Sequence, residues 1–515
     1  MEASNYTYEK VKRPTDEQFK QITDKYGFHL TEQEKKDYQR YIDANLEAYD
    51  KLALMPDYLP VVKYPRTPGY FPDPSENKLN AWYVKTEVKG APSGKLAGRK
   101  VVLKDNICLA GVPMMNGCSV LEGYIPEIDA TIVTRLLDAG ATIVGKAHCE
   151  NMCLSGGSFT CAKGPVHNPH KLGHSSGGSS SGTAALVGSG EVELGIGGDQ
   201  GGSIRIPSCW CGCVGMKPTH GLVPYTGIFS IETSLDHAGP ITKNVADNAL
   251  LLEILAGPDD LDPRQYVPEG VYGDYTSNLK EGVKGLKIGI LKEGFGHKES
   301  ETVVDAYVTK AALKFKELGA TVEEVSIPEH LLGPIAFLGI CCEGATQTML
   351  KGNGYGSGYR GLYLPSAMKA QARWKERPDE LSKTTKLFTI LGDYLWDKYD
   401  GTFYAKAQNL SRKLRKAYDD KLKEYDIIIM PTLPYRAPAL PKKDCDMDAY
   451  IANALGMVAN TSIFDATGHP ALNLPIAKVD DLPIGMMMVS KHYNESVIYK
   501  AAFAWEKAYD WKKEN

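Results

Sequence analysis

Two glycine- and serine-rich segments decide the fold of this chain: Gly177-Gly-Ser-Ser-Ser-Gly-Thr183 and Gly197-Gly-Asp-Gln-Gly-Gly-Ser-Ile-Arg-Ile-Pro207. The residues between them predict a short helix followed by a short strand. Each glycine costs backbone entropy on folding, so this density is favoured only where backbone N–H groups must approach another group closely. Serines in such a setting indicate hydroxyl chemistry, and the function is therefore sought here.

The composition of the whole chain sets its broad class. With 515 residues, 43% of them hydrophobic, the chain has enough apolar sequence for one large α/β body with additions or for several domains. The net charge is −4 and no long basic run occurs, so nucleic acid is not expected as a partner. The first residues lack the basic and apolar regions of a signal peptide, and there is no run of about eighteen apolar residues. We therefore expect a cytoplasmic protein without a membrane partner.

Cysteines and histidines form two clusters that resemble metal sites. The eleven cysteines are expected to be reduced thiols, because no secretion signal accompanies them. In Cys209-Trp-Cys211-Gly-Cys213 the spacing is too short for a usual zinc site and a second ligand pair is missing; the alternation instead fits one face of a buried strand or turn. His167, His170 and His174 lie in a proline- and glycine-rich loop with no obvious acidic partner. No metal site is expected from either cluster.

The segment Gly140–Lys146 has the spacing of a phosphate-binding loop. Its middle residues, Ala-Thr-Ile-Val, have the pattern of a β-strand, which is unable to wrap around a phosphate. Ala147 also stands where such loops carry the Ser or Thr that binds a metal ion. We therefore expect no nucleotide site here.

From about residue 96 short apolar strands alternate with helices, which predicts an α/β fold whose central β-sheet, largely parallel or mixed, is flanked by helices. Residues 1–80 are predicted to form a helical extension, and residues 81–515 the main domain, with a helical insertion or lid around 340–425. Asn494 is the expected N-cap of the last helix. The predicted strands are 100–103, 141–144, 191–196, 286–292, 321–327 and 426–430, and the predicted helices are 16–26, 31–53, 130–137, 302–318 and 494–511.

Ser203 is the strongest candidate for a nucleophile. It follows Gly201-Gly202, and two glycines in a row expose consecutive backbone N–H groups of the kind that an oxyanion hole requires. A serine at the end of such a loop is placed to attack a carbonyl carbon. Because a free serine hydroxyl is a poor nucleophile, a nearby base must accept its proton.

The residues alone leave the identity of this base open. Histidine is the usual base, and lysine is the rarer one. Lys104 closes a predicted strand, where α/β sheets deliver functional groups. A lysine in water has a pKa of about 10.4, which burial is able to lower by several units; by composition alone an ordinary surface lysine is the better expectation. The histidines closest in sequence are His167, His170, His174 and His220.

Several segments together resemble the amidase signature family of serine hydrolases. The spacing from Ser179 to Ser203 also agrees with that family. The segments are Lys104-Asp-Asn106, Gly177-Gly-Ser-Ser180, Gly198-Asp-Gln-Gly-Gly-Ser-Ile-Arg-Ile-Pro207 and Cys211-Gly-Cys-Val-Gly-Met-Lys-Pro-Thr219. The bacterial nitrile-degradation amidases, a subgroup that acts on simple amides, are similar at Gly111–Gly117, Asp236–Pro240 and Met430–Pro434 and in the helical extension. The resemblance thus covers nearly the whole chain.

The resemblance implies an amidase signature catalytic domain with a triad of Ser203, Ser179 and Lys104. Ser203 is the implied nucleophile, Ser179 a bridging serine on a cis peptide bond, and Lys104 the base. Backbone N–H groups of residues 200–203 are expected to hold the oxyanion.

The resemblance also implies residues around the triad. The oxyanion and substrate-binding residues are expected to be Gln200, Gly201, Gly202, Cys153 and Ser155. Supporting roles fall to Ser180, Asp199 and Arg205, where Arg205 either pairs with Asp199 or is solvated.

At two places the chain carries larger side chains than the family usually has. Ser181 stands where relatives often carry glycine, and Cys209-Trp210 replaces smaller residues. Trp210 is bulky enough to alter the packing below the nucleophile or to narrow a pocket, so the size of the substrate stays open.

The implied function is hydrolysis of a small carboxylic amide to an acid and ammonia through an acyl-enzyme. A simple carbamate is the alternative substrate, because it presents the same C(=O)–NH2 group beside an alkoxy substituent. Weaker alternatives are an inactive binding protein and a glutamine-cleaving amidotransferase subunit. No metal or organic cofactor is expected, since a serine acyl mechanism carries its own nucleophile and oxyanion donors. A homodimer is expected from the resemblance alone.

Overall fold

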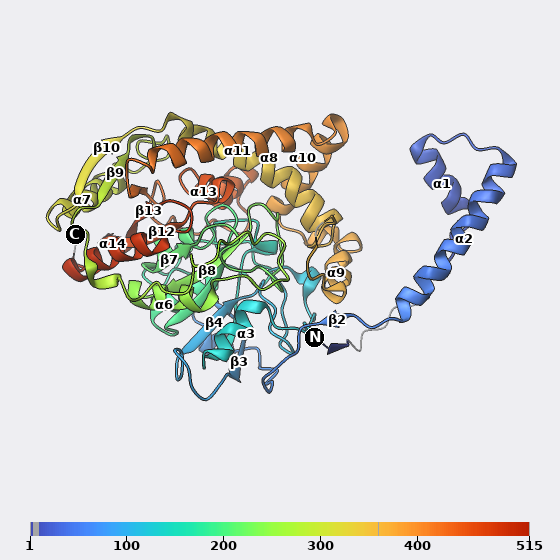
Figure 1. Ribbon diagram of the computed structural model, residues 1–515, viewed down its shortest axis with the longest axis horizontal. Coiled ribbons are helices and arrows are strands. Elements are labelled where there is room, and N and C mark those ends of the chain that lie inside the picture. The colour runs from blue at the N-terminus through green and yellow to red at the C-terminus, as the bar shows by residue number, and fades with distance from the viewer. Residues whose placement is uncertain (1, 4–9, 359, 514–515) are drawn as a thin grey trace. The chain divides into compact units, whose positions relative to one another are not determined.

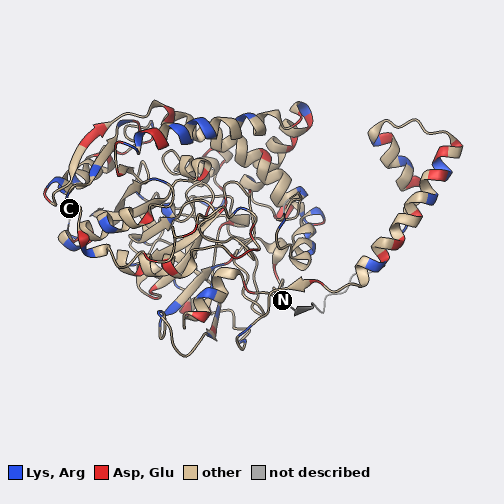
Figure 2. Cartoon of the chain, in the orientation of Figure 1, with Lys and Arg blue, Asp and Glu red and all other residues tan. Residues whose placement is uncertain are grey.

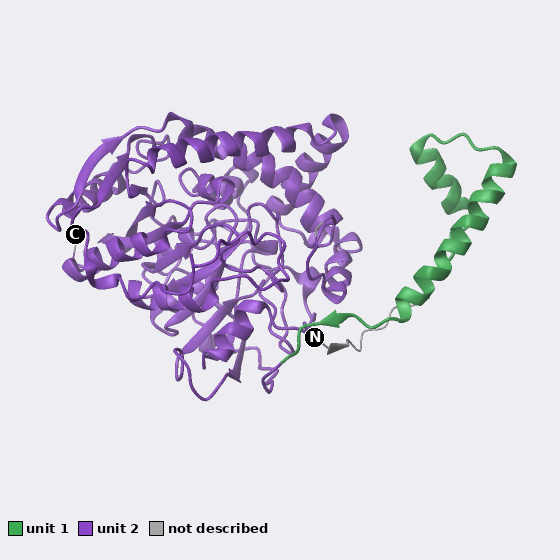
Figure 3. Ribbon diagram, viewed as in Figure 1, with its two compact units in different colours: residues 1–62 green, residues 63–515 purple. Residues whose placement is uncertain are grey.

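The computed structural model describes residues 2–3, 10–358 and 360–513 (Figure 1). The chain divides into two units after Val62 (Figure 3). This division lies at residue 62 rather than at residue 80, because the segment that follows already contacts the larger unit. Lys63 Nζ lies 2.8 Å from Asp138 Oδ2, and Arg66 pairs with Asp129.

The first unit contains the two predicted helices, α1 (Asp16–Tyr26) and α2 (Glu32–Leu54). Each helix begins with a capping box, in which a threonine hydroxyl accepts a hydrogen bond from a backbone N–H and a Gln or Glu side chain accepts one in return. Two short strands, β1 (Glu2–Ala3) and β2 (Tyr58–Leu59), pair antiparallel in the same unit.

The larger unit is built on an eleven-stranded mixed sheet, which confirms the predicted α/β architecture (Figure 1). Each of the six strands predicted from the sequence is present, with bounds shifted by a few residues. In order across the sheet the strands are β10 (Thr321–Val325), β9 (Lys287–Leu291), β11 (Ile427–Pro431), β13 (Leu482–Val489), β12 (Ala471–Val479), β7 (Val214–Lys217), β8 (His237–Thr242), β6 (Leu194–Asp199), β4 (Lys100–Lys104), β5 (Thr142–Ala147) and β3 (Trp82–Lys89).

Helices cover both faces of this sheet, so its central strands are buried. Four of the helices, α8 to α11, fall in or next to the region where an insertion or lid is expected. The helices of the larger unit are α3 (Thr131–Asp138), α4 (Ser181–Ser189), α5 (Arg205–Cys211), α6 (Val245–Leu255), α7 (Thr302–Leu313), α8 (Gly333–Ala345), α9 (Pro365–Ala372), α10 (Lys383–Tyr399), α11 (Thr402–Lys421), α12 (Met447–Leu455), α13 (Ser462–Thr467) and α14 (Glu495–Ala508).

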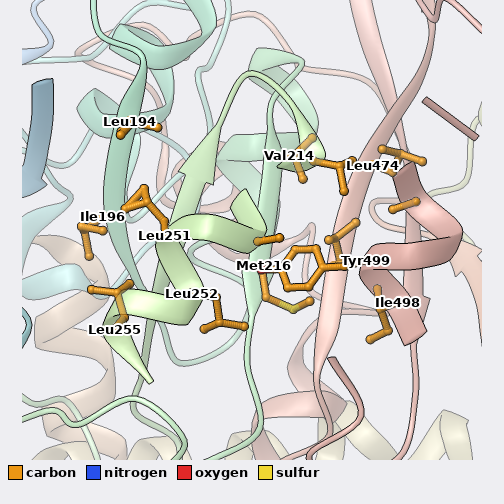
Figure 4. Close-up of a cluster of buried hydrophobic side chains, with 14 of the residues drawn as sticks. Leu194, Ile196, Val214, Met216, Leu251, Leu252, Leu255, Leu474, Ile498 and Tyr499 are labelled. Carbon is orange, nitrogen blue, oxygen red and sulfur yellow. The ribbon is translucent and has the colours of Figure 1, made fainter. Parts of the chain in front are cut away.

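The two faces of β6 carry different residues. Leu194 and Ile196 point to the main core, where they belong to one apolar cluster with leucines of α6 and with residues of α14 (Figure 4). Gly195 and Gly197 alternate with them and therefore face the other side. A Cβ at Gly195 would lie 2.5 Å from Thr183 Cγ2 of α4. The strand is glycine-rich because α4 packs directly against it.

The structure corrects one local prediction and confirms the position of another residue. The segment Cys209–Cys213 is not a strand: α5 runs through Cys211, Gly212 ends it in the left-handed conformation, and Cys213 leads into β7. All three cysteines are buried, so they do serve as core side chains. Asn494 occupies the N-cap position of α14, but its side chain makes no capping bond and instead donates to Ser490 Oγ at 2.9 Å.

Charged residues of both signs lie together on the long exposed helices. Helices α2 and α11 each carry Lys or Arg among Asp or Glu (Figure 2). Within the part of the chain that the structure describes, none of the helices has both the length and the apolar character needed to cross a membrane.

Candidate active site

Lys104, Ser179 and Ser203 come from three segments that meet at one edge of the sheet. Lys104 is the last residue of β4, and Ser203 lies in the loop between β6 and α5. Because β4 and β6 are parallel neighbours, their carboxyl ends deliver both segments to the same place. Ser179 lies just before α4, and it reaches this edge because α4 packs on β6.

Lys104 and Ser179 are in direct contact. Lys104 Nζ donates to Ser179 Oγ at 2.7 Å and to the carbonyl oxygen of Gly198 at 3.2 Å. Both side chains are fully buried. The peptide bond between Gly178 and Ser179 is cis, as the resemblance implies. This arrangement allows a proton to pass between a hydroxyl and an amine.

Ser203 lies next to this pair and lines a cavity. Its carbonyl oxygen accepts from the N–H of Ser180 at 3.3 Å. The residue is 7% exposed, whereas Ser179 is 0% exposed. Across the described residues, no hydrogen bond joins the Oγ atoms of Ser179 and Ser203. The hydroxyl that meets the cavity is therefore that of Ser203.

The backbone N–H groups expected to hold an oxyanion are not equivalent. Gly202 donates its N–H to Asp199 Oδ1 at 2.6 Å, so this group stabilises the loop itself instead of facing a ligand. Gln200, Gly201 and Ser203 all line the cavity. A Cβ at Gly201 would lie 2.7 Å from the Phe337 ring, which explains why this position is glycine.

Asp199 and Arg205 form a buried ion pair, so Arg205 is paired and not solvated. The carboxylate of Asp199 accepts from Nε and Nη2 of Arg205, each at 3.0 Å. Arg205 Nη2 also donates to Asp465 Oδ2 at 2.8 Å, and Nη1 donates to the Thr461 carbonyl at 2.9 Å. The N–H of Ile204, the N-cap residue of α5, donates to Asp199 as well, at 3.0 Å. These bonds close the loop that carries Ser203 onto the start of α5.

The charges in this network are unevenly shared. Burial alone would raise the pKa of Asp199, but the Arg205 guanidinium holds it below its ordinary value. Burial and the charge of Asp199 together raise the pKa of Asp465. Asp199 is therefore the carboxylate that carries the negative charge opposite Arg205.

Ser180 ties the Ser179 loop to β6. Its Oγ donates to the Gly198 carbonyl at 3.1 Å and accepts from the Gly198 N–H at 3.2 Å. The two glycines before Ser179 are tightly enclosed. A Cβ at Gly177 would lie 2.7 Å from Pro207 Cα, and a Cβ at Gly178 would lie 2.7 Å from Glu150 Cγ.

The side chains of Gln200 and Ser155 also have defined partners. Gln200 Nε2 donates to the Tyr225 hydroxyl at 2.7 Å. Ser155 Oγ accepts from the Gly157 N–H at 3.1 Å and donates to the Ala454 carbonyl at 3.4 Å. Both residues line the cavity, but these bonds use their side chains to fix the loops.

Cys153 places a thiol beside the Lys104–Ser179 pair. Its backbone is left-handed, with φ of 62°, and its Sγ donates to Asn116 Oδ1 at 3.2 Å. Burial would raise its pKa, but the thiol of Cys149 and the nearby Lys104 lower it to about 7. Cys153 is thus a cavity residue with chemistry of its own, whereas Cys149 and Cys161 are buried in the core.

A cavity of about 190 Å³ lies in front of Ser203. Its polar part is provided by Cys153, Ser155, Gly156, Gln200, Gly201 and Ser203. Helices α8, α10 and α12 contribute to the remainder, which is apolar. The apolar lining residues are Leu154, Ile206, Ile231, Pro334, Phe337, Leu338, Cys341, Phe388, Leu455 and Val458.

Trp210 does not line this cavity. Its ring is fully buried in a cluster that includes Leu433 and Met457, and its Nε1 donates to the Tyr435 carbonyl at 3.0 Å. Trp210 is therefore part of the core packing and does not narrow the cavity.

A second buried ion pair, Asp105–Lys146, escaped prediction from the sequence. Asp105 Oδ1 lies 3.0 Å from Lys146 Nζ, and Asp105 Oδ2 accepts from the N–H groups of Met115 and Asn116, each at 2.9 Å. These bonds fix the chain immediately after Lys104. The sequence did contain a signal for this pair, because Asp105 follows the predicted strand 100–103 and Lys146 follows the predicted strand 141–144. Asp465 gave no such signal, because it lies 260 residues from Arg205 in sequence.

Comparison with known proteins assigns this site to a family. The family model Amidase matches residues 70–498, so the chain belongs to the amidase signature family, as the resemblance indicated. The chain is 43% identical to an enantioselective amidase of Rhodococcus rhodochrous over 502 residues, which is 95% of each protein. It is 36% identical to a glutamyl-tRNA(Gln) amidotransferase subunit from Exiguobacterium sibiricum over 82% of this chain and 86% of that protein.

A comparison with solved structures also shows similarity to an amidase. The native peptide amidase of Stenotrophomonas maltophilia superposes with a TM-score of 0.66 at 27% identity, covering 81% of this chain and 83% of that one. The protein is an amide-hydrolysing enzyme with the amidase signature fold.

Proposed function

We propose that this enzyme hydrolyses small carboxylic amides with an apolar acyl group, through Ser203, Ser179 and Lys104. The observation that carries the proposal is the 2.7 Å contact between Lys104 Nζ and Ser179 Oγ, buried beside a serine that lines a cavity. A buried amine–hydroxyl pair next to a second hydroxyl is the arrangement that activates a serine without a histidine.

The mechanism begins with proton transfer. Neutral Lys104 accepts the Ser179 proton while Ser179 accepts the proton of Ser203, and Ser203 Oγ attacks the amide carbonyl carbon. The N–H groups of Gln200, Gly201 and Ser203 are the proposed oxyanion donors. Gly202 is omitted because its N–H is bonded to Asp199.

Collapse of the tetrahedral intermediate breaks the C–N bond. The relay then runs in reverse, and Ser203 regains no proton at this stage because its oxygen is held in the acyl-enzyme ester. The proton from Lys104 passes through Ser179 to the leaving nitrogen, which departs as ammonia. Water activated by the same pair hydrolyses the ester and returns a proton to Ser203.

The cavity supports the choice of acyl group. Its volume of about 190 Å³ suits an aromatic or branched aliphatic group, and burial of such a group is favourable at roughly 25 cal/mol per Å². Among the described residues that line it there is no Lys, Arg, Asp or Glu. A charged acyl group would lose its hydration without gaining a partner.

The test is a substrate panel in which ammonia release is measured for aromatic amides, aliphatic amides, simple carbamates and glutamine. The proposal expects the highest kcat/KM for amides with an apolar acyl group and no turnover by Ser203→Ala. Carbamate turnover above that of every amide would establish the alternative substrate. Failure of every compound with the wild-type enzyme would contradict the proposal.

Glutamine is the second candidate substrate because of the similarity to glutamyl-tRNA(Gln) amidotransferase subunits. Its α-ammonium and α-carboxylate groups need charged partners, which the lining of the cavity lacks in the described structure. We therefore expect glutaminase activity to be low. The homodimer and the cytoplasmic location remain predictions.

A further inference from the structure

Three side chains with metal-binding atoms converge away from the proposed triad. Asp419 lies on α11, His469 lies between α13 and β12, and His492 lies between β13 and α14. In the described part of the chain, this is the group of His, Cys, Asp or Glu residues whose ligand atoms all lie within 4.8 Å of one another. The three residues come from separate segments of the larger unit, so the fold brings them together.

Both imidazoles face the same carboxylate oxygen. His469 Nε2 lies 3.1 Å from Asp419 Oδ1, and His492 Nδ1 lies 3.6 Å from that atom. The two rings are close as well, with centroids 4.1 Å apart. The other oxygen, Asp419 Oδ2, lies 3.6 Å from Arg415 Nε. Oδ1 is therefore the oxygen directed at the histidines.

The other nitrogen of each ring is held by Thr467. His492 Nε2 lies 3.0 Å from the Thr467 carbonyl oxygen, and His469 Nδ1 lies 3.0 Å from Thr467 Oγ1. Metal-binding histidines commonly have their second nitrogen fixed in this way by a carbonyl or another polar group. A single residue at the end of α13 thus orients both rings.

The Thr467 carbonyl determines the tautomer of His492. A carbonyl oxygen only accepts, so His492 must carry a proton on Nε2. In the neutral ring, Nδ1 then presents a lone pair to Asp419 Oδ1, which is also an acceptor. Two acceptors facing each other at 3.6 Å repel unless a proton or a metal ion lies between them.

His469 can adapt to such a cation. The Thr467 hydroxyl is able either to donate to His469 Nδ1 or to accept from it. When it accepts, Nε2 of His469 carries the lone pair and becomes a ligand atom. The two histidines and the carboxylate would then offer two nitrogens and one oxygen.

We propose that Asp419, His469 and His492 form a binding site for one Zn²⁺ ion. Zinc–nitrogen and zinc–oxygen bonds of about 2.0–2.2 Å in tetrahedral geometry place ligand atoms roughly 3.4 Å apart. The distances of 3.1 and 3.6 Å to Asp419 Oδ1 bracket that value. The side chain of Asp419 is 42% exposed, which gives the ion access from solvent and leaves the fourth position to water.

The site would stabilise α13. Thr467, the last residue of this helix, orients both histidines. Asp465 within the helix and Thr461 at its N-cap accept hydrogen bonds from Arg205, which lies next to the loop of Ser203. An ion held by α11 and the loops after α13 and β13 would fix these segments together. None of its ligands lines the cavity of Ser203, so the proposed ion would act by holding these segments together.

The experiment measures Zn²⁺ binding to the chelator-treated full-length protein by calorimetry and metal analysis. We expect one Zn²⁺ per chain and a rise in the thermal midpoint when the ion binds. Asp419→Asn and His492→Gln should each weaken binding by at least about 10- to 100-fold. The matched control is Asp420→Asn on the same helix, whose carboxylate pairs with Lys416 and Lys423 instead; it should bind as the wild type does.

A Co²⁺-substituted sample separates this site from the cysteines. The proposed ligands predict visible d–d bands without the near-ultraviolet charge-transfer band of a thiolate ligand. Absence of Zn²⁺ binding by the wild type would overturn the proposal. Equal binding by Asp419→Asn and His492→Gln, or a thiolate band, would place the ion elsewhere and would overturn it as well. Thermal unfolding of the metal-free variants checks that they fold.

Discussion

The two serine loops differ in what holds them in place. Both are closely packed, because Gly177 and Gly178 in one loop and Gly201 in the other leave no space for a Cβ. The Ser203 loop is held in addition by the buried ion pair of Asp199 and Arg205. Close packing without an ion pair suits the proposed relay, in which Ser179 keeps one distance to Lys104. The ion pair closes its loop from behind and leaves the Ser203 hydroxyl at the cavity.

Ser203→Ala is expected to have the largest effect, because it removes the atom that bonds to the acyl group. The kcat for amide hydrolysis should fall by about 10⁴-fold or more, measured as ammonia release. Ser179→Ala should retain more activity, since it removes only the relay. If Ser179→Ala were the more damaging change, the roles assigned to the two loops would be reversed.

Lys104→Ala is expected to lower kcat/KM by about 10³-fold, because it removes the proposed general base. The measurement is ammonia release by Lys104→Ala and by the wild type under the same conditions. A kcat/KM of Lys104→Ala equal to that of the wild type would argue against a lysine base.

Asp199→Asn tests the electrostatic support of the Ser203 loop. It leaves Asp465 to pair with the buried Arg205 guanidinium and removes the charge of Asp199 from the loop, which should lower the free energy of unfolding by about 3 kcal/mol. Asp480→Asn is the control, because Asp480 pairs with Arg436 but its side chain is 73% exposed. Asp480→Asn should lower the free energy of unfolding, measured by urea denaturation, by less than about 1 kcal/mol. Similar losses would mean that the buried pair contributes no more than a surface pair.

Gly177→Ala tests the packing of the Ser179 loop. Gly177 has φ of +76°, and an added Cβ would meet Pro207. Gly173 is the matched control: its φ is +81°, but nothing lies within 4 Å of an added Cβ. Both variants carry the backbone strain of roughly 1–2 kcal/mol, so any further loss of stability in Gly177→Ala, expected to be about 1–3 kcal/mol, reports the packing. Equal thermal midpoints of unfolding for Gly177→Ala and Gly173→Ala would show that the Ser179 loop accommodates the added methyl group without further loss of stability.

Alternating strands and helices allowed the α/β class to be predicted, and the structure shows that the sheet is mixed. The resemblance of the segments at Lys104, Ser179 and Ser203 to a known family indicated where the site lies, and the structure brings these segments together. The helix over Cys209–Cys211 escaped because every residue of α5 is buried, so no polar face marks a helical period. Asp465 and the α8 wall of the cavity escaped because only the folded chain brings them to Ser203 from distant segments. The same holds for Asp419, His469 and His492, which share no local motif.

The most direct test of the mechanism is to locate the acyl-enzyme. A slowly hydrolysed amide or ester is mixed with the wild type, the reaction is quenched with acid, and peptides are analysed by mass spectrometry. The mechanism predicts the acyl mass on the peptide that contains Ser203, at Ser203 itself, and its loss in Ser203→Ala. Cys153 is the internal competitor, because it lines the same cavity and its pKa is lowered to about 7. An acyl group on Cys153 or Ser179 would contradict the assignment of the nucleophile.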